Sequence, residues 1–381
     1  MKIGFAGRWN PLNKTAWSGI YFNTYTEIKK YYPVESFYYK WPWQVRESLL
    51  LHKQFQKLSG KKAAVEFLKG YGKHFSKQLE KDLLKRKVDL LFVPSAPQLI
   101  AYCNTNIPIV YMTDATFLQL QGYYPLFSEI ANYNIQQGID MDRLVFQKAS
   151  HCMLASDWTK ASAINDYHID ANKISVVPFG ANIDAAPSID SLKLAPNEIC
   201  QLLFLGVEWE RKGGQIALDT LHALNKNGIS AQLTIIGCTP PGFVEGQFSD
   251  ENVSIIPFID KHHQSEVNRL NDILSKSDFL LLPTRAECAG IVFCEASAYG
   301  IPAITTNTGG VGNYVKDGIN GYALPLEAGS DEYATVIQKV FTDKVGYRQL
   351  CISSRKRYEE DLNWENWGAA FHQIAKNILQ P

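Results

Sequence analysis

The most constraining feature of this sequence is an apolar run at residues 278–283, which is followed by a stretch rich in small residues at residues 284–310. The run has the length and residue types of a strand that is buried on both faces of a parallel sheet. We expect Glu287 in the loop after this strand and Glu295 in a helix that begins near residues 289–290. At 3.6 residues per turn, Glu295 lies about one and a half turns from the start of that helix.

This arrangement predicts the chemistry of a ligand. Gly290, Ile291 and Val292 would present unpaired backbone N–H groups at the start of the helix, and such groups bind anions. The carboxylates of Glu287 and Glu295 suit hydroxyl groups. Together these groups suit a sugar joined to a diphosphate.

The stretch resembles the E-x7-E signature of the retaining glycosyltransferases of family 4, which have the GT-B fold. The resemblance continues through Gly300-Ile301-Pro302, Gly309-Gly310 and Asp317-Gly318-Ile319-Asn320-Gly321. A structural helix with two solvated glutamates would be the better interpretation of a bare E-x7-E, but the pattern extends over about forty residues.

The resemblance implies an α/β chain of two Rossmann-like, doubly wound domains that face each other across a cleft. Residues 1–180 would form an N-terminal acceptor-binding domain and residues 198–361 a nucleotide-sugar-binding domain. A C-terminal helix within residues 362–381 would pack back on the first domain. The residues themselves agree with this division, because the 381-residue length favours two domains and residues 181–197 have the composition of a linker.

Composition and cysteine usage indicate a cytoplasmic protein. No run of about eighteen uncharged apolar residues predicts a membrane-spanning helix, and the first residues read as a strand instead of a signal peptide. The seven cysteines are scattered without a C-x-x-C pair, which fits a reducing compartment.

Charge is distributed unevenly along the chain. Residues 1–175 contain 22 Lys plus Arg against 14 Asp plus Glu, a net charge of +8, although the whole chain is neutral. Residues 46–87 look helical and carry a lysine at nearly every fourth position. A solvated helix surface is the favoured interpretation, and peripheral contact with anionic lipid headgroups on the inner face of a membrane is the alternative.

The resemblance also implies roles for the charged residues. Lys212 matches the family's lysine that contacts the diphosphate. Arg211 is a weaker match, because many members have an arginine where this chain has Val207. Both cations would stand in a loop before a helix, where the helix dipole repels them unless an anion binds. Glu295 would bind ribose hydroxyls and Glu287 a hydroxyl of the transferred sugar.

Other candidate residues follow the carboxyl ends of predicted strands. Cys238, Phe258 and Ile259 are expected near the nucleotide base. Gly19 would allow close approach of the backbone to donor phosphate or acceptor. Asp114 is placed to orient an acceptor hydroxyl, and its interpretation as an ordinary helix N-cap stays equally open.

The leading hypothesis is a retaining hexosyltransferase that uses a nucleotide diphosphate sugar and a glycan, lipid-linked or small-molecule acceptor. The family's front-face mechanism needs no enzymic nucleophile. Because the GT-B glycosyltransferases that this stretch resembles work without a metal ion, we expect neither a metal nor a cofactor. Alternatives on the same fold are a disaccharide phosphorylase or synthase and a non-catalytic partner that binds sugar nucleotides. We expect no nucleic-acid partner.

Overall fold

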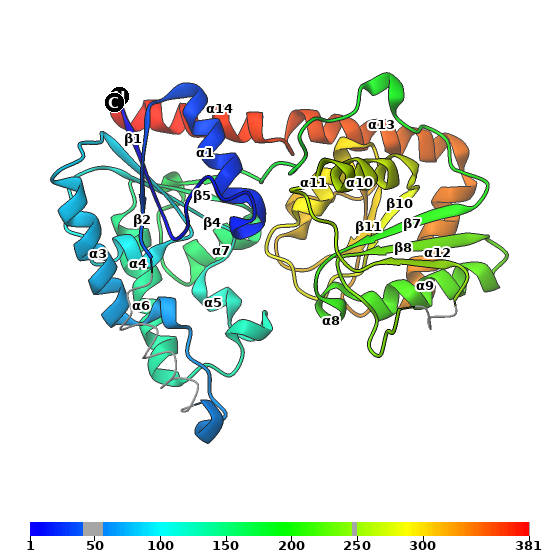
Figure 1. Ribbon diagram of the computed structural model, residues 1–381, viewed down its shortest axis with the longest axis horizontal. Helices are drawn as coiled ribbons and strands as arrows, with labels where there is room; N and C mark the ends of the chain where they lie inside the picture. Colours follow the sequence, from blue (N-terminus) through cyan, green and yellow to red (C-terminus); the bar gives the residue numbers. More distant parts are fainter. Residues whose placement is uncertain (41–55, 246–249, 381) are drawn as a thin grey trace. The chain divides into compact units, whose positions relative to one another are not determined.

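The computed structural model describes residues 1–40, 56–245 and 250–380, which divide into two compact units. Unit 1 consists of Met1–Pro178 and Trp364–Pro381, and unit 2 of Phe179–Asn363 (Figure 1). The segment at residues 181–197, which the sequence predicts as a linker, is part of unit 2. Within it, Ala181 N–H donates to the carbonyl of Leu362 at 3.2 Å.

Unit 1 contains a six-stranded sheet in which every recorded pairing is parallel. Its strand order is β2-β1-β3-β4-β5-β6. The strands are β1 (Ile3–Gly7), β2 (Val34–Tyr38), β3 (Leu90–Pro94), β4 (Ile109–Thr113), β5 (His151–Leu154) and β6 (Ile174–Val176). The central strands β1, β3 and β4 are buried throughout, as their continuous apolar sequences predict.

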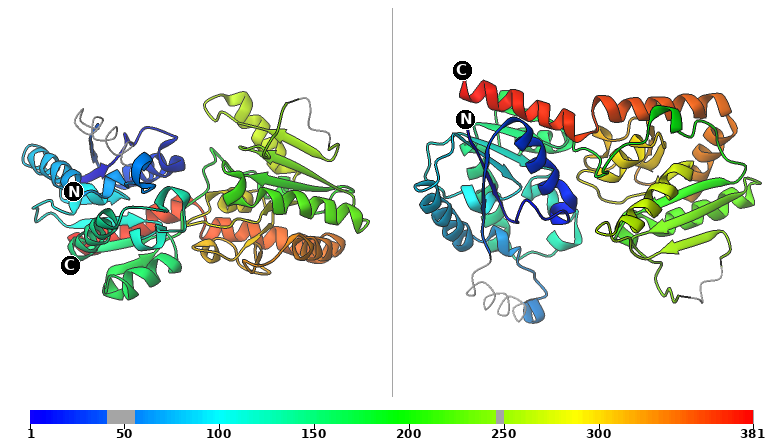
Figure 2. Two further views of the ribbon diagram at one scale, coloured as in Figure 1. Left: turned by 90° about the horizontal axis from the view of Figure 1, so that it is seen from below. Right: turned by 45° about the horizontal axis from the view of Figure 1, so that its top comes forward.

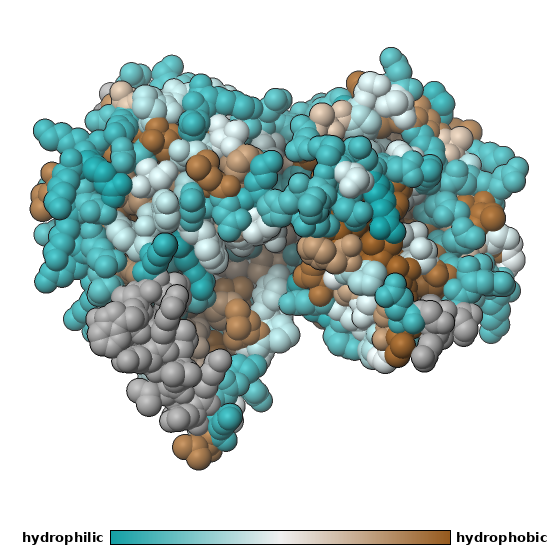
Figure 3. Space-filling model, viewed as in Figure 1, coloured by the Kyte–Doolittle hydropathy of each residue, from teal (hydrophilic) through white to brown (hydrophobic). Residues whose placement is uncertain are grey.

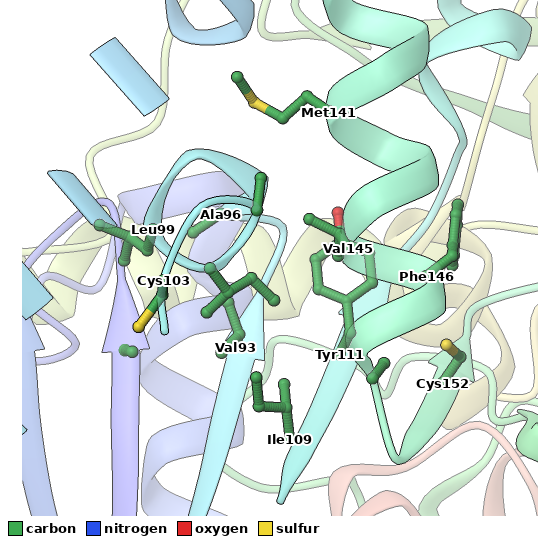
Figure 4. Packing of buried hydrophobic residues seen from close by; sticks show 14 of the residues in the cluster. Val93, Ala96, Leu99, Cys103, Ile109, Tyr111, Met141, Val145, Phe146 and Cys152 are labelled. Atoms are coloured by element: carbon green, nitrogen blue, oxygen red, sulfur yellow. The ribbon is translucent and has the colours of Figure 1, made fainter. Parts of the chain in front are cut away.

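Helices cover both faces of this sheet because alternate strand side chains point to opposite sides. Phe92 of β3 contacts Trp367 and Phe371 of α14 (Trp364–Leu379), which packs beside α1 (Ile20–Tyr31) (Figure 1). Val93, its neighbour, points to the other face, into a core that includes Val145 of α6 (Asn132–Lys148) (Figure 4). The same layer contains α3 (Lys69–Leu83), α4 (Pro97–Ile100) and the nearby α7 (Asp157–Asn165).

Unit 2 contains a second six-stranded parallel sheet, with the order β12-β11-β10-β7-β8-β9. The strands are β7 (Cys200–Leu205), β8 (Ala231–Ile236), β9 (Val253–Ile256), β10 (Phe279–Leu282), β11 (Ala303–Thr306) and β12 (Gly321–Leu324). Strand β10 is fully buried and confirms the strand expected at the apolar run. Both sheets therefore confirm the predicted doubly wound α/β class.

The helices of unit 2 also form two layers. Helix α9 (Gly214–Lys226) packs against α12 (Ser330–Thr342) on one face of the sheet, and α11 (Ile291–Ala298) packs against α13 (Lys344–Glu360) on the other. Figure 2 shows the two layers from further directions, with α10 (Gln264–Lys276) on the same side as α11. The helix that contains Glu295 thus lies directly against the sheet.

The helical prediction for residues 46–87 is wrong in part. Its first residues, up to 55, lie outside the described residues. Between Gly60 and Leu68 the chain is mostly irregular and includes only the short turn η2 (Val65–Phe67). Gly60 adopts a left-handed conformation with φ of 69°, which an α-helix cannot accommodate. Residues 56–59 are helical, as predicted, and the longer helix α3 begins at Lys69.

Helix α3 carries what we call the lysine face, formed by Lys69, Lys73, Lys77 and Lys81. All four side chains are exposed, and the surface over α3 is hydrophilic in Figure 3. In the described part of the chain, none of the four makes a salt bridge. No helix among the described residues is both long enough and apolar enough to cross a membrane.

Candidate functional site

The predicted donor residues follow β7 and β10, the two strands between which the order of the second sheet reverses. The chain runs from β7 outward through β8 and β9, and then returns to place β10 on the other side of β7. In open parallel α/β sheets, ligands bind beyond the carboxyl ends of the strands at such a reversal. The segments after β7 and β10 are therefore expected to form a site.

The segment after β7 forms a short helix, α8 (Trp209–Lys212), where the sequence analysis expected a loop. Gly213 ends this helix with a φ of 73°, and a Cβ there would lie 2.0 Å from the carbonyl oxygen of Pro283. The carbonyl of Arg211 also accepts hydrogen bonds from Arg285 N–H at 2.7 Å and from the Thr284 hydroxyl at 3.2 Å. Backbone contacts thus fix α8 against the loop after β10.

These contacts bring Lys212 and Glu287 together across 75 sequence positions. The Lys212 ammonium donates to Oε2 of Glu287, and both residues are buried, at 8% and 6% exposure. Nη1 of Arg211 lies 3.7 Å from the same oxygen, and it donates to the carbonyl of Ala286 at 2.9 Å. The main-chain carbonyl of Glu287 accepts from Gly310 N–H at 3.0 Å, so the glycine pair at 309–310 helps to position this loop.

Arg211 and Lys212 lie in the single turn of α8, directly before the start of α9, as predicted. The chain itself supplies negative charge at this position. Glu287 provides a negative partner for both, and Glu208 pairs with the Nε of Arg211. The resulting cluster places ammonium, guanidinium and carboxylate groups side by side. The two cations can bind an anion, and the carboxylate can accept a hydrogen bond from a hydroxyl group.

Helix α11 begins at Ile291 with Gly290 as its N-cap, as predicted. The N–H groups of Gly290, Ile291 and Val292 make no hydrogen bond to any part of the chain that the structure describes. Gly290 packs on Phe293, whose ring would lie 2.2 Å from an added Cβ. The helix start therefore carries free donors and the positive end of the helix dipole.

Glu295 forms a second ion pair. It lies in α11 as predicted and is buried at 5% exposure, and its Oε1 accepts from Lys261 Nζ at 3.0 Å. Lys261 also reaches the carbonyl of Asn182 at 3.5 Å. The sequence analysis missed Lys261, because the polar segment after β9 offers no signal that singles it out.

The residues expected near a base follow three adjacent strands, β7, β8 and β9. Gly237, with a φ of 96°, lets the end of β8 approach Gly206, whose carbonyl oxygen would lie 2.7 Å from an added Cβ. Burial raises the pKa of the next residue, Cys238, to about 11, although the nearby charge of Lys212 lowers it. Phe258 is 71% exposed, whereas its neighbour Ile259 is buried. Val207 is also exposed, so two of these strands end in uncovered apolar side chains.

Gly19 and Asp114 belong to unit 1. Gly19 is the left-handed N-cap of α1, with a φ of 87°. The interpretation of Asp114 as a helix N-cap is wrong, because Thr116 caps α5 (Phe117–Leu120) in a reciprocal capping box with Gln119. The main-chain carbonyl of Asp114 accepts from the Thr159 hydroxyl at 2.5 Å, which holds this loop against α7.

Arg285 is a further residue that the sequence analysis did not single out. Its Nη1 is buried and makes no hydrogen bond to the described residues. Burial raises the pKa of Tyr333, and the nearby Arg285 charge opposes that rise. Among the described residues, no group of three His, Cys, Asp or Glu side chains could hold a metal ion.

Comparison with known proteins finds similarity to glycosyltransferases. Residues 200–343 match the family model described as glycosyl transferases group 1. Glycogen synthase from Mycobacterium tuberculosis is 28% identical over 185 residues, which cover 46% of this chain and 42% of the relative. The chain spans about half the length of the curated relatives that it matches.

Two solved structures resemble nearly the whole chain. Sucrose-phosphate synthase from Thermosynechococcus elongatus has a TM-score of 0.68 and 15% identity, and covers 99% of both chains. Anabaena HepE, solved with UDP and glucose, has a TM-score of 0.63 and 15% identity, and covers 100% of both chains. The fold is GT-B, as the sequence predicted.

Proposed function

We propose that this protein is a retaining glycosyltransferase. It would transfer a hexose from a nucleoside diphosphate sugar to a hydroxyl of a glycan, lipid-linked or small-molecule acceptor. The observation that carries the proposal is the buried Lys212–Glu287 pair beside the unoccupied N–H groups at the start of α11. The match of residues 200–343 to glycosyl transferases supports the same reaction class.

The leaving diphosphate needs positive charge that is already in position. Lys212, Arg211 and the start of α11 supply it, because fixed cations and free N–H groups stabilise negative charge as it develops on the phosphate. Glu287 holds Lys212 in place before the donor binds and then accepts a hydroxyl of the transferred sugar. These groups can compensate the diphosphate without a metal ion.

Glu295 is proposed to bind the ribose. A buried carboxylate can accept hydrogen bonds from two vicinal hydroxyls, and the hydrogen bond from Lys261 orients it before the nucleotide binds. The base would lie against the exposed ring of Phe258, near Cys238 and Ile259. HepE was solved with UDP, which makes UDP the first nucleotide to test.

In the proposed reaction, the acceptor hydroxyl attacks the anomeric carbon from the face that the diphosphate leaves. The new carbon–oxygen bond forms as the sugar–phosphate bond breaks, and the departing phosphate oxygen takes the acceptor's proton. No side chain acts as a nucleophile. Asp114 is proposed to orient the acceptor hydroxyl, and Gly19 to admit donor phosphate or acceptor.

Slow hydrolysis of the donor tests the reaction without knowledge of the acceptor. Incubation with UDP-glucose and its GDP, ADP and TDP counterparts should release glucose from one of them, and proton NMR should show the α-anomer first. EDTA should leave the rate unchanged, and Lys212→Met should reduce it at least 100-fold, whereas Lys226→Met, an exposed control, should not. Initial release of the β-anomer would refute retention, and full activity of Lys212→Met would refute the assigned role.

A further inference from the structure

The loop after β9 brings a lysine to Glu295. Lys261 lies in this loop, three residues after Phe258. Its Nζ donates to Oε1 of Glu295 in α11 at 3.0 Å and to the carbonyl oxygen of Asn182 at 3.5 Å. All these residues belong to unit 2. The ion pair therefore ties the loop after β9 to the helix whose start carries the free N–H groups.

The main chain around Lys261 is ordered before any ligand binds. Oδ1 of Asp260 accepts from His262 N–H at 2.9 Å, and the main-chain carbonyl of Asp260 accepts from His263 N–H at 3.0 Å. Ile259 is buried and anchors the start of this turn. The side chain of Lys261 is half exposed, so a ligand can reach its ammonium group.

Glu295 keeps one oxygen available. Its Oε1 accepts from Lys261, whereas Oε2 has no hydrogen bond to the described residues. Oε2 is also not one of the described side-chain atoms that are both buried and without a partner, so a ligand can reach it. The hydrogen bond to Oε1 restrains the rotation of the carboxylate and holds Oε2 in one direction.

An ammonium group beside a carboxylate matches a hydroxyl group that accepts and donates at once. A lysine has three N–H donors, of which Glu295 and Asn182 use two. The third can donate to a hydroxyl oxygen while the hydrogen of the same hydroxyl goes to the carboxylate. Both hydrogen bonds involve an ionised group, and such bonds are roughly twice as strong as neutral ones.

The position of the ion pair favours the 2′-hydroxyl of a ribose. Lys261 belongs to the same loop as Phe258, against which the base would lie. The 2′-carbon is bonded to the carbon that carries the base, whereas the 3′-carbon is one bond further from it. Ile291 and Glu295 are about 6 Å apart along the axis of α11, a distance that a pentose and its phosphate can span.

We propose that Lys261 is a specificity-determining residue that, with Glu295, selects ribonucleotides and rejects 2′-deoxyribonucleotides. The inference rests on the proposed function, because it concerns the same donor site. It narrows the donor to a sugar on a ribonucleoside diphosphate and excludes sugars on deoxythymidine diphosphate. A deoxyribose would leave the ammonium N–H and a buried carboxylate without partners, and a site built for a hydroxyl strongly rejects an analogue that lacks it.

Calorimetric titration of the full chain with UDP and 2′-deoxy-UDP, and with the corresponding ADP and GDP pairs, tests the proposal. Each charge-assisted hydrogen bond contributes about tenfold in affinity, so the wild type should prefer the ribonucleotide about 100-fold. Lys261→Met removes one of the two bonds, and the preference should fall to about tenfold. Lys276→Met is the matched control, because Lys276 also pairs with a carboxylate, Asp272 at 2.7 Å, on the exposed surface of α10.

The ratio of the two affinities separates selection from mere support of the site. A preference that falls in Lys261→Met but not in Lys276→Met supports the proposal. An unchanged preference in Lys261→Met, or wild-type binding of 2′-deoxy-UDP within about threefold of UDP, overturns it while the donor assignment stands. Failure of every nucleotide to bind overturns the donor assignment and this inference with it. Lys261→Ala lets water reach Glu295, so it gives the same comparison if Lys261→Met does not fold.

Discussion

Substitution of Lys212 by Met should destabilise unit 2 and should do so through Glu287. The Glu287 carboxylate is buried at 6% exposure and would keep the Arg211 guanidinium, at 3.7 Å, as a nearby cation. Breaking a buried ion pair from one side typically costs about 3–5 kcal/mol. The remaining attraction of Arg211 reduces this, so we expect a loss of about 2–3 kcal/mol. For a unit of about 150–250 residues, that corresponds to roughly 4–12 °C in Tm.

A double-mutant cycle tests the cause. Glu287→Gln should also destabilise, because it leaves the Lys212 ammonium buried without its carboxylate. The double variant removes both charges and should return to within about 1 kcal/mol of wild type, which gives a coupling energy of about 2 kcal/mol or more. Differential scanning calorimetry of the full chain measures all four proteins. Additive losses in the double variant, or a Lys212→Met protein that melts within 1 °C of wild type, would refute the reasoning.

Three further predictions concern other parts of the fold. Gly213→Ala should lower the stability of unit 2 by more than about 2 kcal/mol, because the new Cβ would clash with the Pro283 carbonyl. The control Gly228→Ala has a similar φ of 83° but open space around it, so it should cost only about 1 kcal/mol. Equal losses of stability on thermal denaturation would disprove the clash. Burial raises the pKa of Asp142 to about 7, so the native state holds a proton that the unfolded state releases above about pH 4. The free energy of unfolding should therefore fall between about pH 4 and pH 7, and urea titrations of Asp142→Asn should lack this fall. The favoured solvated interpretation of the lysine face predicts that replacement of its four lysines by Gln leaves sedimentation with anionic vesicles unchanged; loss of that sedimentation in the variant would support membrane contact instead.

The strands and the helix of the E-x7-E stretch could be predicted because their local sequences are unambiguous. The apolar run at residues 278–283 predicted β10, and β3 and β4 are buried apolar strands of the same kind. The positions of Glu287 before α11 and Glu295 within it follow from the same local pattern. These features depend on residues that are close together in the sequence.

The partners of the site residues could not be predicted, because they depend on the folded chain. Lys212 meets Glu287 only after β7 and β10 become neighbours in the sheet, and Lys261 meets Glu295 across 34 positions. The sequence therefore predicted the two cations but not the Glu287 carboxylate as their partner.

Calorimetric titration with UDP, GDP, ADP and TDP tests the central claim, that unit 2 binds a nucleoside diphosphate at the ends of β7 and β10. The account predicts that one of them binds the wild-type protein without added metal. Glu295→Gln should weaken that binding at least tenfold, since it removes the proposed ribose acceptor, while the exposed control Glu360→Gln binds as wild type does. Failure of all four nucleotides to bind, or equal affinity of wild type and Glu295→Gln, would contradict it.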